Sequence, residues 1–444
     1  MPNHSGTAII DYYLNGGAMV TVSVPLQAGK VTVEQVNHDV GPNQEVSARV
    51  NLPNPGTAER VIHFDNGTWH GSTDKVGATH AASEWDFAEG STLAPYDEYL
   101  TLQNPASSSV SATLSYQTES GDHPRKTLSL PAKSRTTVEV MSGDLTDNPA
   151  CTPGAGGTCG VGRGHTGVAV RVTAGAPLIV ERPFYVDDFS FGFGAIRDGH
   201  VAPGANQPAR TWYFAEGTTL SGFNEYLTLQ NPGSVSAAVT LDYFTDSGRK
   251  VTKRLAVPPL TRSTVLVFQG DLSSAICSAG VNGNCGIGRG VVGVSLTVSS
   301  DQPIVAERPM YVVHDFGTGI VAGASDAVGA SQLGTVFGFS AGSTQPGDNE
   351  YLTIENPSSS LAANIRVAYY TSSGIINRTF VVGAATRHTV LVFANDGEGA
   401  GPGFDLLGIV VTSDQGVLVE KPSYSSNPAT YGATDTMAYS PAAF

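Results

Sequence analysis

Apolar and polar residues alternate over short stretches through most of this chain, and turn-forming residues separate the stretches. In 225–230, for example, Leu227 and Leu229 face one side of an extended backbone and the residues between them face the other. Asp246-Ser-Gly248 then forms a hairpin turn between two such stretches. About seven short strands are expected between 211 and 311, the last two at 291–298 and 303–311, and no segment of useful length has a helical period.

This pattern predicts an all-β chain built of antiparallel β-sandwiches of immunoglobulin-like type. The Cys…Trp…Cys core signature of true immunoglobulin domains is absent, so the expected likeness is one of architecture.

The strand pattern recurs along the chain. The octapeptide at 98–105 returns unchanged at 225–232 and nearly unchanged at 350–357, with its tyrosines 127 and 125 residues apart. Such a period is a whole domain, because solenoid repeats are only about 20 to 50 residues long. The predicted divisions are a partial module at 1–84, module 1 at 85–210, module 2 at 211–334, and module 3 with a C-terminal tail at 335–444. A structural role in every module is expected for Glu98, Tyr99, Glu225, Tyr226, Glu350 and Tyr351.

The first 84 residues match only the later part of a module. Residues 7–17 correspond to 239–248, 30–36 to the strand at 262–268, and 55–60 to 303–308. The aromatic opening strand and the Glu-Tyr-Leu strand have no counterpart in this partial module. At the other end, Gly432-Ala-Thr434 matches the linker Gly77-Ala-Thr79, so the tail is expected to stop where a next module would begin.

A sandwich that lacks strands exposes apolar surface and unpaired backbone groups. A strand from another copy can fill such a gap, and this contact, repeated head to tail, produces an open filament. The expected assembly residues are Ile9, Ile10, Tyr12 and Tyr13 in the partial module and Met437, Tyr439 and Phe444 in the tail. The alternative is that Met1 is a misassigned start or a cleavage boundary within a longer repeat array.

Composition narrows the classes of function. Only 14% of residues are charged and the net charge is −15, which disfavours nucleic acid as a partner. No apolar run reaches 18 residues, so no membrane insertion is expected.

The four cysteines form two pairs, Cys151 with Cys159 and Cys277 with Cys285, at the same place in modules 1 and 2. Glycine-rich loops between them favour two local disulfides and an oxidising compartment over a zinc site, which would need four ligands close together. Module 3 has 396–405 in this place without cysteine.

Motifs for catalysis occur in the wrong context. The G-x-G-x-x-G matches at 162–167 and 288–293 lead into strands, whereas a dinucleotide site needs a following helix. The G-x-S-x-G match at 338–342 lacks the strand, turn and helix of a nucleophile elbow. The histidines do not recur in register. The prediction is therefore that the chain is not an enzyme and has no cofactor or metal.

Carboxylates at 187–188 and 348–350 could hold calcium at a module junction, but carboxylates in solvated turns are favoured. Asn66 and Asn377 fit the glycosylation sequon, as does Asn3.

Adjacent acid and base residues recur in register in all four units. Because neighbouring residues of a strand face opposite sides, one member of each pair is expected to bridge to another strand or module. A repeated structural ion pair is favoured over a catalytic pair. The pairs are Glu59 and Arg60, Glu181 and Arg182, Glu307 and Arg308, and Glu420 and Lys421.

With its motifs at 212–219, 225–232 and 305–311, the chain resembles tandem-repeat surface proteins of bacteria, a largely uncharacterised class of secreted all-β proteins. It also resembles the subunit of an extracellular fibril built of immunoglobulin-like domains. The resemblance covers essentially the whole chain; the broken opening motif of module 3 and its missing cysteines depart from it. It implies an extracellular protein, at the cell surface or secreted, without catalytic residues.

The expected function is the structural subunit of an extracellular filament, whose partner is another copy of itself. The alternative is a cell-surface adhesin or carbohydrate-binding stalk with cell-surface glycans as partners. An adhesin should carry an exposed aromatic patch, whereas a filament should bury its aromatic residues at module ends.

Overall fold

The computed structural model describes residues 4–65, 67, 69–144, 151–154, 156–190, 192–271 and 276–438. Almost all regular structure in these residues is β-strand, which confirms the predicted all-β class. The described helix α1 (Val36–Val40) is a single short turn. The preceding residues, expected to form a strand by their match to 262–268, form none. In module 2 that strand pairs with the Glu-Tyr-Leu strand, and the first unit has no such strand to pair with.

Module 2 shows the architecture most clearly. Its strands are β13 (Ala209–Phe214), β14 (Phe223–Asn231), β15 (Ala237–Thr245), β16 (Lys250–Val257), β17 (Thr261–Leu266), β18 (Val294–Asp315) and β19 (Ile320–Val328). The first half of β18 pairs with β13 and β15, and its second half pairs with β14 and β19, all antiparallel. Two layers therefore share one long strand, which replaces the two separate strands expected at 291–298 and 303–311.

Modules 1 and 3 repeat this topology. The strands of module 1 are β6 (Ala82–Phe87), β7 (Tyr96–Asn104), β8 (Val110–Thr118), β9 (Arg125–Leu130), β10 (Ser134–Glu139), β11 (Val168–Ser190) and β12 (Ala195–Pro203). Those of module 3 are β20 (Gly334–Phe339), β21 (Asp348–Asn356), β22 (Ala363–Thr371), β23 (Gly374–Val382), β24 (Thr386–Leu391), β25 (Gly408–Ser425) and β26 (Gly432–Met437). The first strands begin close to the predicted module starts at 85, 211 and 335. Independent folding of each range stays a prediction.

The core of each module lies between its two layers. In module 2 the opening strand places Trp212 and Phe214 against Leu229 of β14 and Leu241 of β15, and all four side chains are buried. The indole Nε1 of Trp212 donates to the carbonyl of Ile304 at 2.9 Å, so the one polar atom of the ring is satisfied. The alternation seen in the sequence thus sends one face of each strand into its own module.

The N-terminal unit, residues 4–76, is a partial version of the same module. It has a three-stranded sheet of β2 (Met19–Leu26), β1 (Gly6–Leu14) and β3 (Val46–Asn51), followed by the hairpin of β4 (Glu59–Asp65) and β5 (His70–Val76). By position, β1 and β2 correspond to β15 and β16 of module 2. The strands β3 and β4 correspond to the first and second halves of β18, and β5 corresponds to β19. Among the described residues, no strand takes the places of β13 and β14. The outer edges of β3 and β4 therefore have no strand partner within the described parts of the chain.

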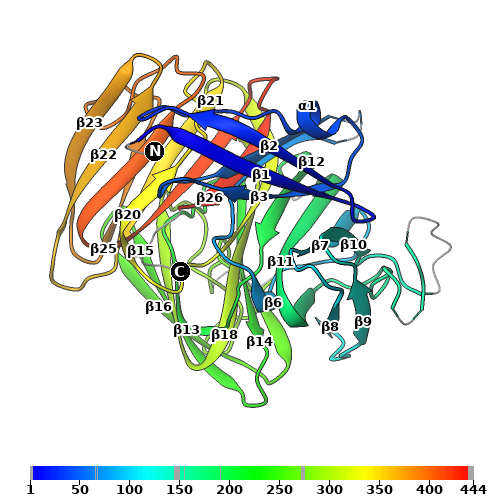
Figure 1. Ribbon diagram of the computed structural model, residues 1–444. Helices are drawn as coiled ribbons and strands as arrows, with labels where there is room; N and C mark the ends of the chain where they lie inside the picture. Colours follow the sequence, from blue (N-terminus) through cyan, green and yellow to red (C-terminus); the bar gives the residue numbers. More distant parts are fainter. Residues whose placement is uncertain are drawn as a thin grey trace.

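The four units form a closed ring around a central axis. The last strand of each unit packs beside the last strand of the next, in the order β5, β12, β19, β26 and back to β5. In Figure 1 the blue strands β1–β3 lie between the orange module 3 and the teal module 1, with β26 near the middle. The C-terminal strand thus meets the N-terminal hairpin of its own chain.

Candidate assembly site

Buried ion pairs join neighbouring units at three of the four contacts, here called seams. At the seam between modules 1 and 2, Arg182 Nη2 lies 2.9 Å from Glu307 Oε2 and 2.7 Å from Asp326 Oδ2, and all three side chains are fully buried. At the next seam Arg308 contacts Glu420 at 2.8 Å and also Asp435. Each recurrent acid therefore pairs with the base of the preceding unit, and not with its own neighbour in sequence.

The third seam, between module 3 and the N-terminal unit, has a lysine in place of the arginine. Lys421 Nζ lies 2.9 Å from Asp74 Oδ2 and 3.6 Å from Glu59 Oε1. Both acids come from the β4–β5 hairpin, so the partial unit takes part in the ring as the full modules do.

Each seam carboxylate also holds the loop that follows the opening strand of the preceding module. This opening loop is 87–90 in module 1, 214–217 in module 2 and 339–342 in module 3. Glu307 accepts the backbone N–H groups of Ala88 at 3.1 Å and Glu89 at 2.9 Å. Glu420 accepts that of Ala215 at 2.7 Å, and Glu59 accepts those of Ser340 and Ala341.

Basic side chains also contact these opening loops, two of them at the opening loop of module 1. Arg182 donates to the carbonyl of Glu89, while Arg262 of module 2 donates to the carbonyl of Ala88 at 3.0 Å and to the carboxylate of Glu89 at 3.2 Å. Arg387 of module 3 does the same for the opening loop of module 2. The opening loops of modules 1 and 2 are therefore each held by a carboxylate and an arginine from the next unit and by an arginine from their own long strand. The opening loop of module 3 is held by Glu59 of the next unit and by Lys421 of its own long strand.

The fourth seam, between the N-terminal unit and module 1, keeps these side chains but has no described opening loop. Glu181 Oε2 pairs with Arg60 Nη1 at 2.8 Å, and Arg135, the counterpart of Arg262, pairs with Glu45 Oε2 at 2.6 Å. Arg60 is 36% exposed and Glu181 is 22% exposed, whereas Glu307 is fully buried. Val201 stands where the other seams have an aspartate. The ion pair of this seam is more exposed to solvent than those of the other three, so it is called the open seam below.

One aspartate occupies the axis of the ring. Asp198 of β12 is fully buried and accepts backbone N–H groups from Gly199 at 2.8 Å, Ala324 at 2.9 Å and Ala433 at 3.3 Å. Burial raises the pKa of this carboxyl to about 8, although the N–H groups oppose the shift. The neighbouring strand needs Gly71 here, because a Cβ at that position would lie 1.8 Å from Asp198 Oδ1.

A lysine side chain also lies near the axis, where it contacts two other units. Lys75 of β5 is buried, and its ammonium group donates to the carbonyls of Asp326 at 2.8 Å and Asp435. Burial lowers the pKa of this ammonium group against the pull of the surrounding carboxylates. The first unit is thus tied to modules 2 and 3 at the centre of the molecule.

The residues predicted to have a structural role lie in equivalent places in the three full modules. Glu98, Glu225 and Glu350 are buried, and burial raises the pKa of each carboxyl to about 8. The tyrosines that follow them meet a tyrosine of the long strand edge to face, with ring centroids 6.0 to 6.2 Å apart: Tyr99 with Tyr185, Tyr226 with Tyr311, and Tyr351 with Tyr424.

The buried glutamate also explains the glycine that ends the opening loop. Gly90 has φ +152°, and a Cβ there would lie 2.7 Å from Glu98 Oε1 and 2.3 Å from the carbonyl oxygen of Val168. Only glycine fits between the carboxyl group and the strand.

Two of the four expected assembly residues of the partial module, Ile10 and Tyr12, are part of its own core. Ile10, Tyr12 and Tyr13 are buried in β1, Ile9 is partly buried, and the Tyr12 hydroxyl donates to Asp39 at 2.7 Å. They do not present a free docking surface.

The tail needs a similar correction. Gly432–Thr434, interpreted as a linker, begins β26, where Asp435 lies opposite Pro422 as Asp326 lies opposite Pro309. The segment up to Met437 pairs with its own module and is not a free donor strand. Tyr439 and Phe444 lie outside the described residues.

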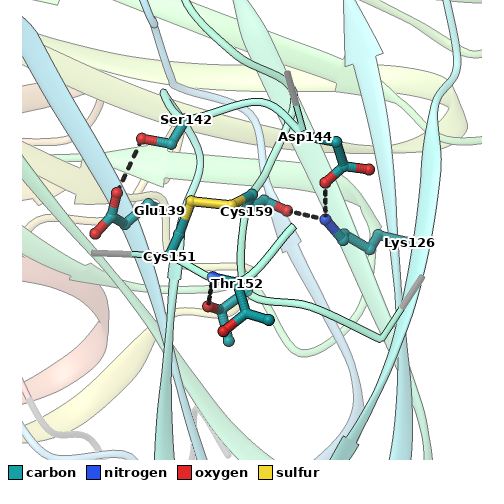
Figure 2. The surroundings of a disulfide bond; sticks show 8 residues. Lys126, Glu139, Ser142, Asp144, Cys151, Thr152 and Cys159 are labelled. Carbon is teal, nitrogen blue, oxygen red and sulfur yellow. Dashed lines mark hydrogen bonds and ion pairs between the residues drawn. A yellow bond between two sulfur atoms is a disulfide. The ribbon is translucent and has the colours of Figure 1, made fainter. Parts of the chain in front are cut away.

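Both disulfides are present, between Cys151 and Cys159 and between Cys277 and Cys285. Figure 2 shows the first, where Lys126 donates to Asp144 at 2.6 Å and to the carbonyl of Cys159 at 2.5 Å. Module 3 replaces the crosslink with hydrogen bonds: Asp396 accepts two backbone N–H groups, and His388 lies 2.7 Å from Glu398.

The described residues of the other candidate motifs form contacts within the fold. Ser340, from the G-x-S-x-G match, donates its backbone N–H to Glu59, and the G-x-G-x-x-G segments precede β11 and β18. Asp348 accepts hydrogen bonds from the hydroxyl groups of Ser425 and Thr430. The Asp188 side chain lies outside the described residues. Within the described part of the chain, no group of three or more His, Cys, Asp or Glu could hold a metal ion.

Of the three candidate glycosylation sites, Asn377 is exposed on β23. Asn66, like Asn3, lies outside the described residues.

Several further site residues recur in register along the chain, although they do not belong to the adjacent acid–base pairs. Arg135, Arg262 and Arg387 recur in register near the start of their strands, as do Asp74, Asp326 and Asp435 near the end of theirs. Asp198 and Lys75 occur once each, so the repeat carries no signal for them.

The fold and seams define an all-β protein of repeated modules closed into a ring. No helix among the described residues is long and apolar enough to span a membrane. No family model and no curated protein matches the chain.

The solved structures that are similar to this chain include two with low scores. One is Thermotoga maritima 1070, with 16% identity and a TM-score of 0.21, covering 28% of this chain and 93% of that one. The other is a tetra-tandem repeat in the extending region of a large adhesion protein, with 12% identity and a TM-score of 0.12, covering 98% and 91%. At these scores neither similarity carries an argument about function.

Proposed function

We propose that this chain is a non-enzymatic structural subunit of an extracellular filament, joined to other subunits by strand complementation at the N-terminal unit. The open seam is the observation that supports this proposal. Among the residues that the structure describes, no strand covers the edges of β3 and β4 as in the other units, and the polar groups of the seam are partly exposed. Sheet edges of this kind accept added strands.

An extracellular location is supported by the two disulfides, since such crosslinks persist in oxidising compartments. The ring favours a rigid building block, because buried ion pairs and the packing of the last strands join its units. The adhesin alternative has less support. The strongly exposed large apolar side chains among the described residues are mostly aliphatic and scattered, with Phe193 as the aromatic exception.

The donor in such a filament has to lie beyond β26, because Gly432–Met437 is packed inside its own subunit. Removal of that strand would therefore destroy the ring and would not test assembly. A chain ending at Ala438 keeps β26 and loses only 439–444, which makes it the informative variant.

The test compares the full chain with this truncated chain by light scattering and negative-stain electron microscopy. We expect the full chain to form threads and the truncated chain to stay monomeric with the same melting temperature. Threads that persist after truncation would exclude the tail as the donor. A full chain that stays monomeric at high concentration contradicts filament formation itself.

A further inference from the structure

We infer that the open seam is a binding site for the opening segment of a module carried by another polypeptide. The ligand class is an extended peptide with an aromatic strand, the sequence Phe-Ala-Glu-Gly and a following Glu-Tyr-Leu strand. This inference rests on the proposed joining at the N-terminal unit and names the chemistry that the unit accepts.

The closed seams show what such a segment contacts. At the seam between modules 1 and 2, the opening loop gives two backbone N–H groups to Glu307 and one carbonyl each to Arg182 and Arg262. The loop glutamate, Glu89, adds an ion pair to Arg262 at 3.2 Å. These contacts use the backbone of the loop and the side chain of Glu89, so the side chain they select for is the loop glutamate.

The open seam presents the same three groups in the same structural positions. Glu181 corresponds to Glu307, Arg60 to Arg182, and Arg135 to Arg262, as the alignment of their strands shows. Here Glu181 and Arg60 pair with each other, and Arg135 pairs with Glu45, whose side chain is half exposed. A bound opening loop would replace these partners with those found at the closed seams.

The strand edges fit the rest of the segment. In module 2 the opening strand places Phe214 opposite Leu296 and Trp212 opposite Val298. The corresponding residues of β3 are Ala48 and Val50; Val50 is 38% exposed, whereas Val298 is fully buried. An opening strand added along β3 would cover this apolar edge and complete a layer.

The Glu-Tyr-Leu strand would add to β4 in the same way. In module 2, Thr228 lies opposite Glu307 and Glu225 opposite Met310. The matching residues of β4 are Glu59 and Ile62, so the register of an incoming strand is defined.

The aromatic residues around Tyr185 show where the Glu-Tyr-Leu strand of a full module would pack. Its counterpart Tyr424 packs edge to face on Phe223, which begins the Glu-Tyr-Leu strand of the preceding module. Tyr185 instead stacks on Trp69, with ring centroids 5.1 Å apart, and meets Phe64 at 5.6 Å. The hairpin β4–β5 thus supplies its own rings where a full module supplies those of β14.

The test measures binding of a fluorescein-labelled peptide of Ala209–Asn231 to the full chain by anisotropy. We expect saturable binding that the unlabelled peptide competes away. Glu181→Gln and Arg135→Ala should each weaken it about tenfold or more, because a buried backbone or carboxylate partner is then left unpaired. Glu398→Gln, which changes a partly exposed ion-paired glutamate of module 3, is the matched control and should have no effect.

Substitutions in the peptide make the result independent of how the chain variants fold. Phe214→Asp in the peptide should abolish binding, because it places a charge between the layers, and a scrambled peptide should not bind. A peptide that binds equally well to the chain and to its Glu181→Gln and Arg135→Ala variants would overturn the inference.

A second labelled peptide, 433–444, separates this inference from the proposed function. If only this tail peptide binds, and Glu181→Gln weakens it, the named ligand is wrong while head-to-tail joining stands. If neither peptide binds, the inference fails, and microscopy of the full chain alone decides the filament proposal.

Discussion

Glu98, Glu225 and Glu350 occupy the same place in their modules, beneath the glycine that ends the opening loop. Burial outweighs the nearby bases and raises the pKa of each carboxyl to about 8. In the folded protein these carboxyl groups therefore keep their protons at pH values where the unfolded chain has released them, because the ordinary pKa of a glutamate is near 4.5. These residues make the free energy of unfolding depend on pH.

Because a carboxyl with a raised pKa binds its proton more tightly when folded, its contribution is full below about pH 4.5 and is lost as the pH rises toward about 8. Glu225→Gln keeps the shape of the neutral form and removes this dependence at one site. We expect the melting temperature of the variant to fall less steeply than that of the parent chain between these pH values. Differential scanning calorimetry across the range checks this, and parallel curves would contradict it.

At the scale of elements, the seams differ in a way that a pair of matched substitutions can measure. Arg182 is fully buried between Glu307 and Asp326, whereas its counterpart Arg60 is 36% exposed beside Glu181. An arginine at a closed seam is therefore expected to contribute much more to the free energy of unfolding than an arginine at the open seam.

Arg182→Met should lower the free energy of unfolding by about 3 to 5 kcal/mol, because it leaves two buried carboxyl groups without their cation. Arg60→Met should lower it by less than about 1 kcal/mol, because its ion pair is partly solvated. Chemical denaturation of both variants provides the comparison. Equal losses in the free energy of unfolding would mean that the ion pair of the open seam stabilises the fold as much as those of the closed seams.

The sequence predicts the elements within a module better than those between modules. Alternation at 225–230 reports which face enters the module's own core, and this prediction holds because Leu227 and Leu229 are buried. It cannot distinguish two strands from one long bent strand, so β18 was expected as two. The strand β26 was interpreted as a linker because it begins with glycine and alanine. In the structure these small residues are needed because the axis of the ring is crowded, and not because the chain turns there.

The recurring acid–base pairs carried enough signal to predict structural ion pairs. Their partners could not be predicted, because each acid pairs with a base more than 100 residues away, as Glu307 does with Arg182. The open seam follows from the missing strands of the first 84 residues, but its three polar groups are recognisable only once the closed seams are known.

At the scale of the whole molecule, ring closure places one carboxylate where backbone groups of several units converge. Asp198 accepts N–H groups from its own strand, from β19 and from β26. The strands β5, β12, β19 and β26 should therefore lose stability together when this side chain is removed.

Asp198→Ala leaves at least three buried N–H groups without an acceptor, which should cost about 3 kcal/mol or more. Hydrogen exchange should accelerate in β19 and β26 as well as in β12. Asp414→Ala, which removes an exposed carboxylate that also accepts a backbone N–H, is the control and should change exchange only locally. Faster exchange confined to β12 would contradict the role of Asp198 in the ring.

The lone aspartate at the axis also shows what a single chain can do that four identical subunits cannot. In a symmetric assembly every substitution appears four times, and four aspartates would crowd and repel one another at one point. Here the equivalent positions of the other units are Gly71, Gly323 and Gly432, so one unit supplies the acid and three supply the room. A chain rebuilt with module 2 in place of module 1 would keep every repeated motif and still lose the residue that holds its axis together.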